Sequence, residues 1–74
     1  MHKVFVDGKW VKCVTFNMYI TAIRSAHFTT DITKAEVFEH LAFAMKAARL
    51  LDGEVYRQVE GGGPNDYYKI DIVH

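Results

Sequence analysis

The sequence has few of the residues that cross-link small proteins through disulfides or a structural metal. Its 74 residues include one cysteine and one proline, and acidic and basic side chains balance at nine each. Because Cys13 has no partner cysteine, an internal disulfide is excluded, and no paired cysteines exist to hold a structural zinc. A single unpaired cysteine also fits a reducing compartment. Stability must therefore come from the apolar core, from a partner subunit, or from both.

Charge and hydropathy argue against two further classes of protein. A zero formal net charge, with basic residues scattered among acids, disfavours a nucleic-acid-binding surface, which normally gathers a basic excess on one face. No window approaches the roughly 18 apolar residues of a membrane span. Asp7-Gly8-Lys9 also interrupts the first apolar run, so no targeting segment is visible. We therefore expect one cytoplasmic domain, residues 1–74, with no membrane contact.

Apolar residues make up 50% of the chain and aromatic residues 14%, which is generous for so small a protein. A chain of this length buries only about 60% of the surface that its unfolded form exposes. Its margin of stability is therefore thin, and we expect a homodimer.

Residues 2–16 predict a β-hairpin. Two runs rich in valine and aromatic residues flank Asp7-Gly8, which suits a two-residue type I′ turn. This turn fixes the register, with the pairs Val6–Lys9, Phe5–Trp10, Val4–Val11 and Lys3–Lys12. One face of the hairpin would carry Val4, Val6, Val11 and Cys13, and the other would carry Phe5, Trp10 and Val14.

Three further strands are expected. Residues 18–23 have β-branched and aromatic character and predict a third strand. Residues 25–28 either extend that strand past a bend or form a short separate one. Residues 54–60 and 67–74 predict a C-terminal hairpin, joined by the polar loop 61–66.

A capping box predicts where the helix begins. Thr33 and Glu36 have the spacing at which each side chain bonds the other residue's amide, and Ile32 and Val37 occupy the positions of a hydrophobic staple. Asp52-Gly53 supplies the stop, with glycine in the left-handed cap. We therefore predict a helix from about residue 34 to residue 52.

The periodicity of this segment predicts two apolar stripes. The core face would carry Val37, Leu41, Ala44, Ala48 and Leu51, flanked by Phe38 and Met45. The second, narrower stripe would carry Phe43, Ala47 and Leu50.

The element order β-β-(β)-α-β-β predicts an α+β two-layer sandwich. A four- or five-stranded, mainly antiparallel sheet would carry one long helix across one face. The other face would stay open, with Phe5, Trp10 and Tyr56 on it.

Candidate catalytic constellations are incomplete. Cys13 would face His2 across the hairpin, but no third group orients the base. Ser25 and His27 would project to one side of a strand without an evident oxyanion hole or pocket. The four histidines lack metal-site spacing. We therefore expect no enzyme, no cofactor and no metal.

The aromatic and apolar side chains are the better candidates for a partner-binding site. They are Phe5, Trp10 and Tyr56 on the sheet, and Phe43 and Leu50 on the helix. Trp and Tyr dominate binding hot spots. The alternatives are that Phe5 and Trp10 merely stabilise the hairpin, by about 0.2–1 kcal/mol, and that the helix stripe packs under residues 24–30.

A second hypothesis is a dimer that binds a small molecule or nucleotide, as a ligand sponge. Arg24, Arg57 and Asn65 would then face the phosphate. Gly61-Gly62-Gly63 lacks the Gly-Lys-Ser/Thr ending and the following helix of a P-loop, so these glycines predict an ordinary hairpin loop.

Three short segments, which together span most of the chain, resemble small proteins encoded by bacterial phages and prophages. They are residues 7–11, residues 28–35 leading into Phe38, and Ala48-Arg49 with Leu51 and Gly53. The resemblance implies a protein of the host cytoplasm that acts by binding a bacterial target, and it carries over no catalytic residues. Our leading hypothesis is therefore a phage-encoded inhibitor that occludes a host protein, such as a component of an antiviral defence system.

Overall fold

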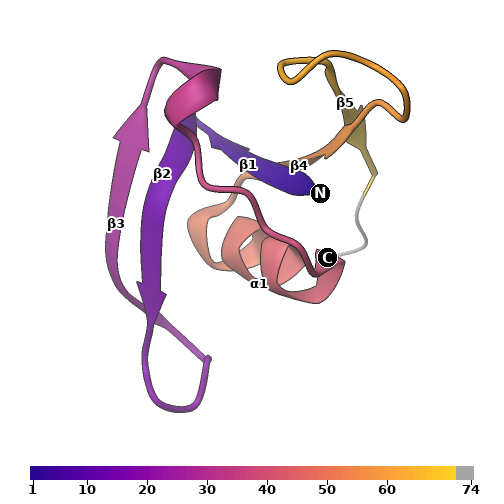
Figure 1. The fold of residues 1–74 in the computed structure, drawn as a ribbon. Helices are drawn as coiled ribbons and strands as arrows, with labels where there is room; N and C mark the ends of the chain where they lie inside the picture. Colours follow the sequence, from indigo (N-terminus) through magenta and orange to yellow (C-terminus); the bar gives the residue numbers. More distant parts are fainter. Residues whose placement is uncertain (72–74) are drawn as a thin grey trace.

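The computed structural model describes residues 1–71 and contains one helix packed on one face of a five-stranded antiparallel sheet (Figure 1). The strands are β1 (His2–Val6), β2 (Lys9–Phe16), β3 (Ile23–Thr29), β4 (Glu54–Gln58) and β5 (Tyr67–Ile70). A short 3₁₀ helix η1 (Ile32–Lys34) precedes the helix α1 (Leu41–Leu51). The strand order is β3-β2-β1-β4-β5. The predicted α+β class and element order are confirmed.

The first hairpin turn forms as predicted. Asp7 and Gly8 have φ angles of 51° and 82°, the left-handed values that a type I′ turn requires at both central residues. Phe5 pairs with Trp10, and Val6 pairs with Lys9. Beyond these two pairs β1 and β2 separate, so the expected pairs Val4–Val11 and Lys3–Lys12 are wrong.

Residues 36–38, which we call the bridging segment, lie between the separated strands. The Glu36 N–H donates to the Val11 carbonyl at 2.9 Å, on β2. On β1, the Phe38 N–H donates to the His2 carbonyl at 2.7 Å and the His2 N–H donates to the Phe38 carbonyl at 2.9 Å. Buried backbone groups must be paired, and the bridging segment supplies these partners where β1 and β2 no longer bond each other.

The predicted start of the helix is therefore wrong. Asp31, not Thr33, is the capping residue, because its carboxylate accepts from the Thr33 N–H at 2.9 Å and from the Thr33 hydroxyl at 2.6 Å. This cap begins only η1, and α1 starts at Leu41. A cap is worth about 0.5–2 kcal/mol. The three backbone bonds of the bridging segment, together with the burial of Phe38, outweigh it.

A β-bulge reverses the faces of β2. Val11 pairs with Phe28 but Cys13 pairs with His27, so Lys12 is an extra residue in β2. An extra residue inverts the alternation of all side chains that follow. Val14 therefore packs against the core and Cys13 is exposed, the reverse of the predicted faces.

The third strand lies later than its predicted range. Residues 18–22 form a turn that is organised by Asn17, whose side-chain oxygen accepts from the N–H groups of Thr21 at 2.8 Å and Ala22 at 3.2 Å. The strand itself, β3, spans Ile23–Thr29. It includes the residues 25–28 that the sequence left open as an extension or a separate strand.

The core lies between α1 and the sheet, where α1 packs on β1 and β4. Its buried members are Val4, Val11, Phe38, Ala44, Ala47, Ala48 and Val55. Ala47 was expected in the outer stripe and is buried, because three alanines allow the helix to approach the sheet closely. Val37, expected in the core, lies in the bridging segment and is exposed.

The left-handed cap of the helix lies one residue before its predicted position. Asp52 is in the left-handed conformation (φ 56°, ψ 45°), so the expectation that Gly53 takes this role is wrong. Gly53 serves a different purpose. A Cβ atom on Gly53 would lie 2.5 Å from Val6 Cγ2 and 2.6 Å from the Phe5 carbonyl oxygen, so only glycine allows β1 to approach this closely.

We predict opposite effects for two neighbouring substitutions. Asp52→Gly removes the steric cost of a side chain in the left-handed backbone conformation. It should therefore raise the free energy of unfolding by up to about 1 kcal/mol. Gly53→Ala forces β1 and the helix end apart and should lower it by about 1–3 kcal/mol. Urea denaturation followed by circular dichroism measures both. A destabilised Asp52→Gly variant, or a fully stable Gly53→Ala variant, would contradict this assignment of the cap.

His2 is buried (6% exposed) under the bridging segment. Its Nδ1 lies 3.3 Å from the Phe38 carbonyl oxygen, and its Nε2 lies 3.2 Å from Arg57 Nε. Because the arginine can only donate, Nε2 is the acceptor and Nδ1 carries the proton. Burial lowers the pKa of His2 below its usual 6.5, and the positive charge of Arg57 acts in the same direction, against the bond to Phe38.

This lowered pKa predicts how stability depends on pH. The unfolded chain protonates His2 near pH 6.5, whereas the folded chain resists protonation until a lower pH. The stabilisation is therefore complete above pH 6.5 and is lost as pH falls from there towards the folded pKa. We expect the Tm to drop between pH 7.5 and 5.5, and His2→Gln to flatten that drop. The control His27→Gln, at an exposed histidine, should show the same drop in Tm as the wild type. A drop of wild-type size in His2→Gln would contradict the prediction.

Candidate functional site

The sheet face opposite α1 carries three packed aromatic side chains, which we call the aromatic cluster: Phe5 from β1, Trp10 from β2 and Tyr56 from β4. The ring centroids of Phe5 and Trp10 lie 4.8 Å apart, those of Trp10 and Tyr56 5.0 Å, and those of Phe5 and Tyr56 5.9 Å. All three pairs meet edge to face. The expectation that these residues share one face is confirmed, and their role in binding stays a prediction.

Strand alternation places the aromatic cluster on this face. Val4 and Val55 are cross-strand partners that point into the core, so the next residues, Phe5 and Tyr56, point away from α1. Edge-to-face pairs contribute about 0.5–1.5 kcal/mol beyond the area they bury. The cluster is therefore held in place by its own contacts, and each of its rings is half-buried.

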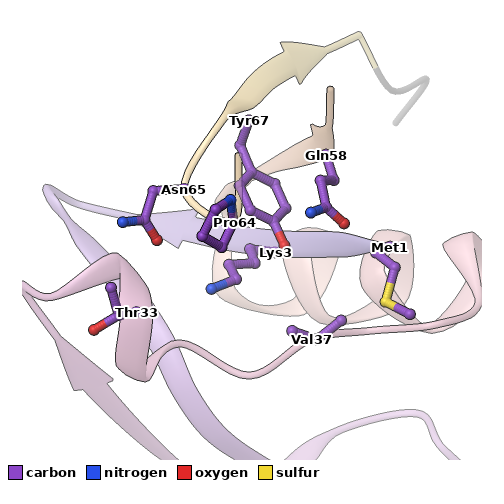
Figure 2. A pocket seen from close by; sticks show the side chains of 8 residues that line it. All are labelled: Met1, Lys3, Thr33, Val37, Gln58, Pro64, Asn65 and Tyr67. Carbon is purple, nitrogen blue, oxygen red and sulfur yellow. The ribbon is translucent and has the colours of Figure 1, made fainter. Parts of the chain in front are cut away.

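A pocket of about 360 Å³ lies on the same face, where η1 and the β4–β5 loop cover the sheet (Figure 2). Its floor includes Lys3, whose cross-strand partner is Tyr56 of the aromatic cluster. The lining residues are Met1, Lys3, Thr33, Val37, Gln58, Pro64, Asn65 and Tyr67. Lysine 3 is the single charged side chain among these lining residues within the described part of the chain.

Lys3 is almost completely buried, with 4% of its surface exposed. Its Nζ donates a hydrogen bond to the Ile32 carbonyl and lies 5.1 Å from the centroid of the Tyr67 ring, a cation–π contact. Burial lowers the pKa of Lys3 below its usual 10.5, and the negative charge of Asp31 partly opposes this. The buried amine is therefore held by a neutral carbonyl and a ring.

The other polar side chains of the pocket are neutral. Burial raises the pKa of Tyr67 above its usual 10.0, so its hydroxyl keeps its proton at neutral pH and can donate. The amides of Gln58 and Asn65 add donors and acceptors, whereas the Thr33 hydroxyl already donates to Asp31 and adds only an acceptor. Such a combination of a cation and neutral donors favours a negatively charged ligand.

The three residues proposed to face a phosphate do not come together. Asn65 lines the pocket. Arg24 is exposed on β3, at the opposite edge of the sheet from β5. Arg57 lies on β4 between Tyr56 and Gln58, so it points to the other face, where it bonds His2.

One of the two candidate nucleophiles, Cys13, is placed differently from the prediction. Cys13 is exposed and its cross-strand partner is His27, not His2. Ser25 Oγ lies 2.7 Å from Thr15 Oγ1 on the neighbouring strand. Across residues 1–71, no three side chains of His, Cys, Asp or Glu gather as metal ligands.

The glycine-rich loop closes on itself. The Gly63 N–H donates to the Asp66 carboxylate at 2.8 Å, and the Gly62 N–H donates to the Val59 carbonyl at 3.0 Å. These amides are therefore engaged within the hairpin loop rather than pointed together at a common ligand.

Sequence reasoning missed Lys3 as a site residue. It placed Lys3 opposite Lys12 and gave it no role. One signal was available: Lys3 alternates with Phe5, so it had to share a face with the aromatic cluster. The cover over Lys3 comes from η1 and the β4–β5 loop, which are distant in sequence, and no local pattern indicates that contact.

The sequence matches no protein-family model, no curated protein and no solved structure. Within residues 1–71, no helix is both long and apolar enough to cross a membrane.

Proposed function

We propose that the chain is a non-enzymatic protein-interaction module whose binding surface is the aromatic cluster. The observation that carries this proposal is the packing of Phe5, Trp10 and Tyr56, edge to face and half-buried, on the sheet face that α1 leaves uncovered. Trp and Tyr are the residues most enriched in binding hot spots. Rings that are already fixed by their neighbours lose little side-chain entropy on binding.

The proposed partner is a bacterial host protein, whose surface the chain would occlude in the host cytoplasm. The support for this choice is the resemblance of residues 7–11, 28–35 and 48–53 to small phage and prophage proteins. A component of an antiviral defence system is the class of target that such an inhibitor would bind.

We further propose that the outer side of α1 forms a homodimer. Phe43 and Leu50 are 44% and 39% exposed and lie seven residues apart, so they share one side of the helix two turns apart. Because α1 and the aromatic cluster lie on opposite sides of the sheet, a dimer formed through α1 would leave the cluster free for the partner.

Binding to a partner is tested with tagged protein in bacterial lysate. A captured protein is accepted as the partner only if it binds the chain again after both are purified, with an affinity that can be measured. Trp10→Ser should then weaken that affinity about thirtyfold, the loss of one hot spot of about 2 kcal/mol. The matched control is Tyr19→Ser, at an exposed aromatic residue in the β2–β3 turn. This substitution should leave the affinity for the partner unchanged. If Trp10→Ser binds the partner as tightly as the wild type does, the aromatic cluster is not part of the interface.

The homodimer is tested by the solution mass from light scattering. We expect twice the chain mass for the wild type and a folded monomer for Phe43→Glu, because a buried unpaired carboxylate opposes association. Trp10→Glu should stay dimeric. A monomeric wild type, or a dimer broken by Trp10→Glu and not by Phe43→Glu, would contradict the assignment of α1 to the self-interface.

A further inference from the structure

We infer that the pocket above Lys3 is a binding site for a small monocarboxylate that has an apolar body. This inference is independent of the proposed protein interaction, because it depends on the covered part of the sheet face and not on the aromatic cluster.

The first observation is a buried cation without a bonded anion. Within residues 1–71, no carboxylate lies within ion-pair distance of Lys3 Nζ; its contacts are the Ile32 carbonyl and the Tyr67 ring. Asp31, which acts on Lys3 at longer range, is already bonded to the N–H and hydroxyl of Thr33. A buried charge is costly unless it is paired, so an anion in the pocket would relieve that cost.

The second observation is the distribution of polar and apolar side chains around the pocket. In Figure 2 the ammonium group of Lys3 points towards Thr33 and Asn65, and the apolar side chains of Val37 and Met1 lie at the other end. A ligand that matches this arrangement has its charged group beside Lys3 and Asn65. Its apolar part then contacts Val37 and Met1.

The third observation sets the charge and size of the ligand. Within residues 1–71, Lys3 is the single charged side chain in the lining and balances one negative charge, so a carboxylate fits better than a doubly charged phosphate. The volume of about 360 Å³ lies at the lower end of the usual range for small-molecule sites, roughly 300–1,000 Å³. An acid with one ring or a short chain has the matching size.

Benzoate is the probe for this site, and benzamide, which has nearly the same shape without the charge, is its matched comparison. Titrations followed by amide chemical shifts in ¹H–¹⁵N spectra should show saturable binding of benzoate, with the largest shifts at residues lining the pocket. The affinities for benzamide and for inorganic phosphate should each be at least about tenfold lower than the affinity for benzoate. The pKa of Lys3, measured from its ammonium resonances, should rise when benzoate is bound.

The loop residue Asn65 provides a variant that leaves the core untouched. Asn65→Glu places a carboxylate where it can pair with Lys3 and should weaken benzoate binding about tenfold. The control Asn65→Gln keeps a neutral amide and should bind as the wild type does. Lys3→Met should abolish binding, but it also alters a buried position, so Asn65→Glu is the deciding variant.

Three results would overturn the inference. They are equal affinity for benzoate and benzamide, tighter binding of phosphate than of benzoate, and benzoate binding unaffected by Asn65→Glu. Trp10→Ser should leave benzoate binding unchanged, so failure of this inference can be told apart from failure of the proposed protein interaction.

Discussion

The backbone pairing of the bridging segment is the contact on which the rest of the structure depends. Residues 36–38 bond His2 on one side and Val11 on the other, and this pairing holds β1 and β2 apart beyond the hairpin turn. It places Phe38 in the core, limits α1 to Leu41–Leu51, and leaves η1 above the sheet as one wall of the pocket. The candidate pocket thus exists because these residues are extended and not helical.

The features that the sequence predicts correctly are those that depend on neighbouring residues. Asp7-Gly8 determines its own turn and thereby the pairing of Phe5 with Trp10. The features that it predicts wrongly depend on distant contacts. The capping box at Thr33 is overridden by bonds to His2 and Val11, which lie more than twenty residues away. The local sequence around Lys12 does not predict a bulge, because the bulge arises only from how β2 aligns with β3.

The same division applies to the candidate site. Alternation alone predicts that Phe5, Trp10 and Tyr56 share the open face, because it needs only the strands and their pairing. The pocket needs a cover from η1 and the β4–β5 loop, and nothing near Lys3 in the sequence indicates it. One sheet face therefore carries two chemically different surfaces. The aromatic cluster is preassembled from rings suited to a protein partner, and the pocket offers a buried cation suited to a small anion.

Amide hydrogen exchange across residues 35–40 tests the bridging segment most directly. We expect the N–H groups of Glu36 and Phe38, with that of His2, to exchange only on global unfolding, because each is bonded within the sheet. The Val37 N–H, which makes no hydrogen bond within residues 1–71, should exchange much faster. This alternation is the signature of a strand. Continuous protection from residue 37 into α1 would instead show that the helix begins at its capping box, and would contradict the arrangement from which the pocket is built.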